Sequence, residues 1–182
     1  MTLSKPDVRG FAARMGTRSG LGGGGFLELP LPVDLGPIRF ALESGFMMVG
    51  RGFKAAATDF FAPQMQLPVG MRVWIAILEG WEIGAGAGVH LNYPLASMRD
   101  AAGNPYTYSA RDLNRLDPGI YSAVGLTTRI GASYGFLFET RYGMSLLNVY
   151  SGSADAAWRW HDFQLILGLR LEFGSSAETE IR

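Results

Sequence analysis

The side chains of this sequence best suited to acid–base catalysis are its two histidines, because imidazole titrates near neutral pH. His161 is followed by Asp162 and preceded by Ser151 and Ser153, whereas His90 lies in a glycine-rich segment. Serine, histidine and a carboxylate together carry out acyl transfer, so His161 with a loop serine is a candidate set. Adjacency in sequence does not supply the geometry of such a set, and a solvated histidine beside an aspartate is common. The sequence keeps catalysis as an alternative and predicts no catalytic residue.

A larger group of charged residues recurs at alternate positions along several segments. Alternate residues of a strand share one face, so these charges are expected to line the interior of a closed sheet. They are Arg14, Arg39, Arg51, Arg72, Arg129, Arg141 and Arg170, with Glu28, Glu43, Glu82, Asp117, Glu139 and Glu172. A buried charge without a partner costs several kcal/mol, so we expect these groups to pair.

The predicted interior network consists of seven charged residues: Glu28, Arg39, Glu43, Arg72, Glu139, Arg141 and Arg170. Within it, Glu28, Glu43 and Arg72 belong to successive segments and can meet across a narrow barrel. Glu139 and Arg141 are expected to approach from the opposite wall. The expected role of this network is a salt-bridge plug, with an ion or proton path as the rival interpretation.

The elements that would position these residues follow from a period of two in the sequence. Eight alternating segments cover residues 8–17, 26–33, 38–51, 64–75, 81–93, 115–129, 134–146 and 163–173. Their apolar faces hold 45 positions without a single charge, where chance would place about eight. The opposite faces carry the charges and most of the glycines.

This pattern predicts an all-β fold, an eight-stranded antiparallel up-and-down transmembrane β-barrel. Each segment is long enough to cross a bilayer when tilted, and such barrels are apolar outside and polar inside. A soluble barrel of lipocalin type, which could bind a small ligand, also alternates. However, an eight-stranded interior holds few side chains and could not enclose 45 apolar ones. Pro30 and Pro68 interrupt two predicted strands in similar contexts, and we expect a shared local bulge there.

Connection lengths give the expected orientation. The links at 34–36, 76–80 and 130–132 are short, and those at 52–63, 94–114 and 147–162 are long. Outer-membrane barrels have short periplasmic turns and longer external loops, so both termini are expected in the periplasm. The chain is expected to be a single domain over 1–182, with the barrel at 8–173 and a periplasmic tail at 174–182. An exported protein of this kind needs a cleaved signal peptide, so Met1 is expected to replace a leader.

Composition excludes several functions. Sixteen basic and sixteen acidic side chains give no net charge, so nucleic acid is not an expected partner. With no cysteine there is neither a disulfide nor a thiolate metal site, and no cofactor or metal is predicted. The glycine run at 22–25 lacks the Lys-Ser/Thr that follows in a phosphate-binding loop.

Three motifs resemble the PorT-like outer-membrane β-barrel family of Bacteroidetes. They are the Glu-Leu-Pro-Leu strand from Glu28, the Asp-Pro-Gly at Asp117, and the strand Phe-Glu-Thr-Arg-Tyr-Gly-Met-Ser-Leu-Leu-Asn-Val from Phe138. The resemblance extends from Val8 to Phe173, implies the barrel fold, and supplies no catalytic residues. The sequence departs from the pattern at Ser145, where the motif has glycine, and in the residues that follow Phe173.

The sequence thus predicts a non-enzymatic outer-membrane protein, structural, accessory or partner-binding, with a side-chain-plugged interior. Its expected partners are outer-membrane lipid and other envelope proteins, which would be recognised by the loops at 52–63 and 94–114. The alternatives are a lipid-modifying hydrolase or acyltransferase using His161 and a loop serine, and a lipocalin-like ligand binder.

Overall fold

The computed structural model describes residues 1–9, 15–33, 35–55, 58–96, 99–104, 116–130, 133–148 and 157–171. Nine strands make up its regular structure: β1 Thr2–Arg9, β2 Met15–Gly20, β3 Gly22–Pro30, β4 Ile38–Ala55, β5 Thr58–Leu78, β6 Trp81–Pro94, β7 Asp117–Arg129, β8 Tyr134–Ser145 and β9 Ala157–Leu171. In this part of the chain no helix has the length and apolar character needed to span a membrane.

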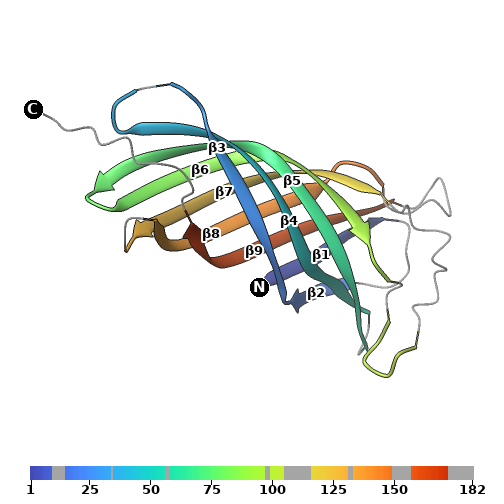
Figure 1. Ribbon diagram of the computed structural model, residues 1–182. Helices are drawn as coiled ribbons and strands as arrows, with labels where there is room; N and C mark the ends of the chain where they lie inside the picture. The colour runs from blue at the N-terminus through green and yellow to red at the C-terminus, as the bar shows by residue number, and fades with distance from the viewer. Residues whose placement is uncertain are drawn as a thin grey trace, which may run out of the picture.

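The strands form one antiparallel sheet that closes into a ring (Figure 1). From β4 to β9 each strand pairs with the next one in sequence, and β1 then pairs with β9 and β2. A further pairing, between β2 and β4, completes the circle. The prediction of an all-β, antiparallel fold is therefore confirmed, and the strands are also connected in the expected sequential order.

The structure has nine strands, one more than predicted, because the strand that pairs with the first edge of β4 is divided into β2 and β3. β2 and β3 lie one after the other along β4, but the register shifts by one residue between Thr17, opposite Phe53, and Gly22, opposite Val49. Such a one-residue mismatch is a β-bulge, which interrupts a strand and increases its twist. The two strands are separated by Leu21, whose carbonyl oxygen accepts a hydrogen bond from the Gly50 amide.

The predicted first strand at 8–17 is wrong. The structure has two strands around this region, since β1 already begins at Thr2 and β2 starts at Met15. The glycine run at 22–25 lies inside β3. Because glycine has no apolar side chain, a glycine-rich strand shows no hydrophobic alternation, which explains why the pattern did not identify it.

The predicted loop at 52–63 is also wrong. β4 and β5 continue as a paired hairpin to Ala55 and Thr58, with Phe53 opposite Phe60. The alternating pattern ends earlier than the strands because both faces of this hairpin are mixed. In the loop expected at 94–114, Arg99 pairs with Phe61 of β5 in an isolated bridge, so the described part of that loop folds back along the hairpin.

The expected inside and outside faces agree with the burial of the described residues along the strands, but Arg129, Pro30 and Pro32, which were expected inside, are exposed at strand ends. On β5, Leu67, Val69 and Met71 are 37–53% exposed, while Gln66 and Arg72 on either side of them are 2–3% exposed. Alternation along a strand produces this arrangement. The ring thus has an apolar outer face and a polar interior.

The predicted bulges at the two prolines are absent. Pro30 ends β3 opposite Ala41, and Pro68 pairs with His90 of β6 in an unshifted register. Between β5 and β4 the register is the same at Ser44 and at Met47. Only the pairs of Gly45 and Phe46 are missing from this ladder. A proline lacks the amide hydrogen of that ladder, and here the strand tolerates the loss without inserting a residue.

Candidate functional site

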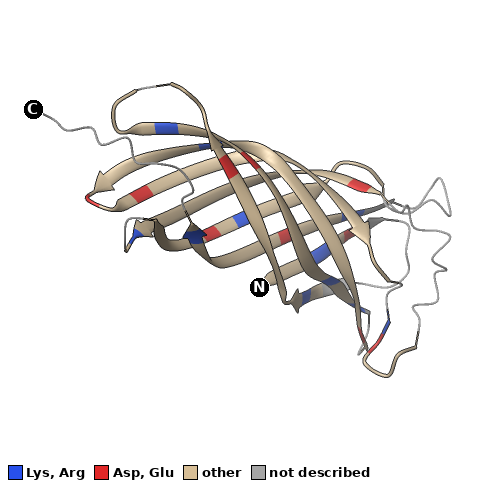
Figure 2. Cartoon of the chain, viewed as in Figure 1, with Lys and Arg blue, Asp and Glu red and all other residues tan. Residues whose placement is uncertain are grey.

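The charged interior of the ring is the candidate functional site, and its side chains come from six strands. Basic and acidic positions lie on neighbouring strands around the ring (Figure 2). The structure brings all seven residues of the predicted network into one chain of ion pairs, which Glu82 of β6 completes. This interior network therefore contains Glu28, Arg39, Glu43, Arg72, Glu82, Glu139, Arg141 and Arg170.

The centre of the interior network is fully buried. Arg72 Nε pairs with Glu43, and Arg72 Nη2 pairs with Glu139. Arg141 Nη2 lies 3.0 Å from a Glu43 oxygen and 2.8 Å from a Glu139 oxygen. The Tyr121 hydroxyl donates a third hydrogen bond to Glu43, at 2.9 Å. Two arginines thus face two carboxylates that have no exposed side-chain surface.

The outer part of the interior network is half-buried and lies toward the end of the ring where β5 turns into β6. Glu82 accepts hydrogen bonds from Arg39 at 3.0 Å and from Arg170 at 2.6 Å. Glu28 lies 3.7 Å from Arg39 and 3.4 Å from Arg72, so it joins this part to the centre. The Trp74 indole nitrogen also donates to Glu28, at 3.2 Å.

A second charged cluster lies further along the interior and was not part of the predicted network. Arg51 of β4 donates to Asp117 of β7 at 2.7 Å and also pairs with Asp162 of β9. All three side chains are 4% exposed or less. We call these residues the Arg51 cluster. Asp162 was missed because the eighth segment was started at Phe163, although alternation extended backward along β9 would have placed it inside.

Uncharged amides extend the polar interior from the Arg51 cluster. Asn92 donates to an Asp117 oxygen at 3.2 Å and accepts from Gln66 at 3.0 Å. Gln66 in turn accepts from Gln164 at 3.0 Å. These three residues come from β6, β5 and β9, so hydrogen bonds cross the interior between distant parts of the wall.

His90 fills the interior where two glycines leave room for its ring. A Cβ atom on Gly119 would lie 2.2 Å from its Nε2, and one on Gly143 would lie 2.9 Å from its Cε1. Its ring stacks on Tyr121, with centroids 6.3 Å apart. The imidazole is 4% exposed, so the structure gives it a packing role inside the ring.

Among the described residues of the candidate catalytic set, Asp162 and His161 do not come together. His161 lies on the outer face, where its Nδ1 is 2.7 Å from the Tyr142 hydroxyl. Asp162 faces inward to Arg51 because consecutive strand residues point to opposite faces. Ser151 and Ser153 lie outside the described residues. The acid therefore cannot orient His161.

Arg and Glu balance each other in the interior network, four against four, so it carries no net charge to attract an ion. The centre of the interior network is buried, and every carboxylate in it is bound by an arginine. The described residues contain no group of His, Asp and Glu side chains arranged to hold a metal. Comparison with models of known families gave no match, and a search among curated proteins gave none.

Proposed function

We propose that this chain is an integral outer-membrane protein without catalytic activity, a plugged β-barrel that serves as a structural or partner-binding subunit. Counting β2 and β3 as one bulged strand gives the eight strands of a small up-and-down barrel. The observation that carries the proposal is the apolar surface: 34 large apolar side chains of the described residues are exposed, most of them on the outer face of the strands. Soluble monomers rarely expose apolar patches of more than a few hundred Å².

Charges on the outer face support a membrane location because they are confined to its ends. At one end, near the last residues of β1, the first residues of β9 and the β4–β5 hairpin, the exposed charged residues are Lys5, Asp7, Lys54 and Arg159. The β5–β6 turn, which contains Glu79, lies at the other. Between these ends β7 runs for 13 residues, Asp117–Arg129, and a tilted strand needs about 9 to 11 to cross hydrocarbon.

The interior favours a plugged barrel over a channel. An eight-stranded barrel is just wide enough for side chains to fill it, and here arginines and carboxylates meet from opposite walls. Ion pairs that join strands across a narrow interior stiffen the barrel, and stiffness suits a scaffold. A lipocalin-like ligand binder would need the reverse, an apolar interior and a polar surface.

The hairpin of β4 and β5 supports a partner-binding role. Its tip lies at the same end of the ring as the last residues of β1, β6 and β8, and the β5–β6 turn lies at the other end (Figure 1). By the usual asymmetry of such barrels the first end faces outward and the second faces the periplasm. The resemblance of the Phe138 strand to PorT-like proteins agrees with an accessory role in the envelope. We therefore place recognition on the β4–β5 hairpin and on the loop that packs against it through Arg99.

Membrane integration is the property to test first. The protein is expressed with an export signal, and envelopes are washed with alkaline carbonate and then solubilised in detergent. We expect it to remain in the washed membranes and to migrate faster on a gel when unheated than after boiling, as folded barrels do. Release by carbonate as a soluble monomer would refute the proposal. A bilayer conductance no higher than that of empty membranes is expected from the plug.

A further inference from the structure

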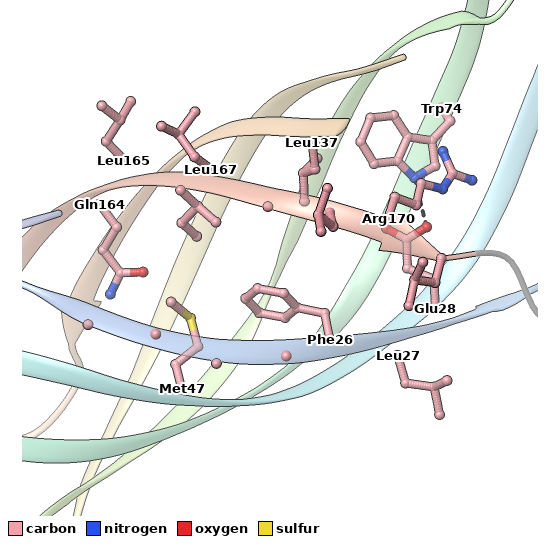
Figure 3. A pocket seen from close by; sticks show the side chains of 18 of the residues that line it. Phe26, Leu27, Glu28, Met47, Trp74, Leu137, Gln164, Leu165, Leu167 and Arg170 are labelled. Carbon is pink, nitrogen blue, oxygen red and sulfur yellow. Dashed lines mark hydrogen bonds between the residues drawn. The ribbon is translucent and has the colours of Figure 1, made fainter. Parts of the chain in front are cut away.

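A small group of basic and polar side chains lies on the outer face of the ring, where β1, β9 and β8 are neighbours. On β9, Leu165 and Gln164 point to opposite sides of the strand (Figure 3). Gln164 is 3% exposed and faces the interior, so the odd-numbered residues of β9, His161 and Arg159 among them, face outward. Lys5 lies directly opposite His161 in the β1–β9 ladder and therefore shares this outer face. Lys5 and Arg159 are exposed, and His161 is half-buried.

Tyr142 of β8 fixes the imidazole of this group. Its hydroxyl oxygen lies 2.7 Å from Nδ1 of His161. A hydroxyl that donates to Nδ1 leaves the imidazole hydrogen on Nε2, which is then a free donor. The Cβ atoms of directly opposite residues are about 4.5 to 5.5 Å apart, so the Lys5 ammonium and the imidazole can contact the same anion. We call Lys5, Arg159, His161 and Tyr142 the outer basic patch.

The outer basic patch carries more positive charge than its neighbours balance. In the described part of the chain no carboxylate lies within ion-pairing distance of Lys5. Asp7, two residues further along β1, lies directly opposite Arg159 and offsets one charge. Among the side chains described on this face of β1 and β9, two basic groups thus face one carboxylate, even with His161 neutral. A cation on a lipid-facing wall is costly, so the excess favours a bound anion.

The outer basic patch borders the apolar part of the wall. The next outward pair of the β1–β9 ladder consists of Leu3 and Phe163, and Phe163 is 45% exposed. Tyr142, 46% exposed, lies directly opposite Phe163 on the β8 side. Tyrosine is enriched at the headgroup level of membranes. A complementary ligand therefore has an anionic head beside Lys5 and hydrocarbon beside Phe163, which describes an anionic lipid better than a soluble anion.

A phosphate monoester matches the head of this ligand. It carries a charge of about −1.5 to −2 at pH 7 and three strong acceptor oxygens, which suit the ammonium of Lys5 and the Nε2–H of His161. A zwitterionic headgroup brings its own cation, which the positive excess of the patch repels. In the orientation proposed above, this end of the ring faces outward. The phosphorylated lipid of that leaflet, lipid A, has the chemistry required.

We propose that the outer basic patch binds the phosphate monoester of an outer-leaflet lipid. Lys5 and the Nε2–H of His161 donate to the phosphate oxygens, Tyr142 orients the imidazole, and an acyl chain lies along Phe163. Arg159 adds to the positive potential beside the phosphate. This inference rests on the proposed function, which places lipid against this wall. It deepens that function by assigning a headgroup and the residues that bind it.

The test measures lipid binding to the full chain in nonionic detergent by native mass spectrometry. The probes are lipid A and the same lipid after its phosphates have been removed by a phosphatase. We expect lipid A to bind at least about tenfold more tightly than the dephosphorylated lipid, because only lipid A makes charge-assisted hydrogen bonds to the patch. Inorganic phosphate at the same concentration is expected not to compete, since it has no acyl chain.

Substitutions locate the bound lipid on the wall. Lys5→Gln is expected to weaken lipid A binding about tenfold and to leave binding of the dephosphorylated lipid unchanged, whereas Lys5→Arg keeps the charge and should retain most of the affinity. Tyr142→Phe releases the imidazole and should weaken lipid A binding by a smaller factor. The matched control is Arg129→Gln, which removes an exposed basic side chain at the opposite end of the ring and is expected to change neither affinity.

Three results would overturn the lipid site: equal binding of the two lipids by the parent protein, unchanged lipid A affinity in Lys5→Gln, or an equal loss of affinity in Arg129→Gln. Effective competition by inorganic phosphate would identify a soluble anion as the ligand and would also overturn it. Retention in carbonate-washed membranes is measured on the same preparation. Loss of that retention would refute the membrane proposal, whereas the comparison of the two lipids in detergent would still report on the patch.

Discussion

Replacement of Arg72 by methionine tests whether the interior network stabilises the ring. Arg72 is 3% exposed and its guanidinium pairs with Glu43, Glu139 and Glu28. The Arg72→Met variant keeps much of the side-chain volume but leaves three arginines facing four carboxylates. We expect the free energy of unfolding to fall by about 3 to 5 kcal/mol, the usual cost of removing one partner of a buried pair.

The remaining contacts place this loss toward the lower end of that range. Arg141 still lies 3.0 Å from Glu43 and 2.8 Å from Glu139, and Tyr121 still donates to Glu43. One guanidinium is then shared by two carboxylates that have no exposed side-chain surface. We therefore expect a loss of about 3 kcal/mol, since one carboxylate cannot be fully compensated.

A double-mutant cycle separates charge imbalance from lost packing. Glu43→Gln alone leaves an excess of positive charge, whereas Arg72→Met combined with Glu43→Gln restores three arginines and three carboxylates. The double variant is expected to lose less stability than the sum of the single variants, by about 1 to 3 kcal/mol. Urea unfolding in detergent micelles, followed by circular dichroism, measures all three. Arg72→Met within about 1 kcal/mol of the parent, or strict additivity, would refute the reasoning.

The other predictions concern packing, the outer face and the histidine. Gly84→Ala is expected to destabilise by about 1 to 3 kcal/mol, because its Cβ would lie 2.3 Å from the buried Trp74 ring; Gly23→Ala, which meets open space, is the neutral control in the same thermal melts. Leu67→Arg places a charge on the outer face and should cost about 2 to 4 kcal/mol in lipid if that site lies near the midplane, whereas Leu67→Ser should cost less; equal stability of both in bilayers would argue against a lipid contact. His161→Ala is expected to change neither folding nor any lipid deacylation, and a lipase activity of the parent that this variant abolishes would restore the catalytic alternative.

The sequence predicted the faces of the strands better than their ends. A face is repeated along the whole strand, so Glu43 and Arg141 could be assigned inward from many neighbouring residues at once. A strand end depends on a few residues, and the pattern weakens there. β9 begins before the apolar alternation does, which hid both Asp162 and the inward Trp160, 1% exposed.

The pairing of particular side chains could be predicted only where strands are neighbours in the sheet. Glu43 and Arg72 lie on adjacent strands, so their meeting follows from sequence order. The contact between Arg51 and Asp162 joins β4 to β9, and it depends on how tightly the ring closes. Likewise the division between β2 and β3 follows from the register shift after Thr17, for which no residue pattern gave a signal.

Accessibility of nitroxide labels along β5 tests most directly whether the ring inserts into a membrane with its apolar face toward lipid and its polar face inside. Single cysteines at 66–71 are labelled one at a time in bilayers, which the absence of native cysteine permits. Labels replacing Leu67, Val69 and Met71 are expected to collide with oxygen dissolved in lipid and not with a water-soluble nickel complex. Labels at Gln66 and Gly70 should be shielded from both. High nickel accessibility at the first three positions, or no alternation along the strand, would contradict the account.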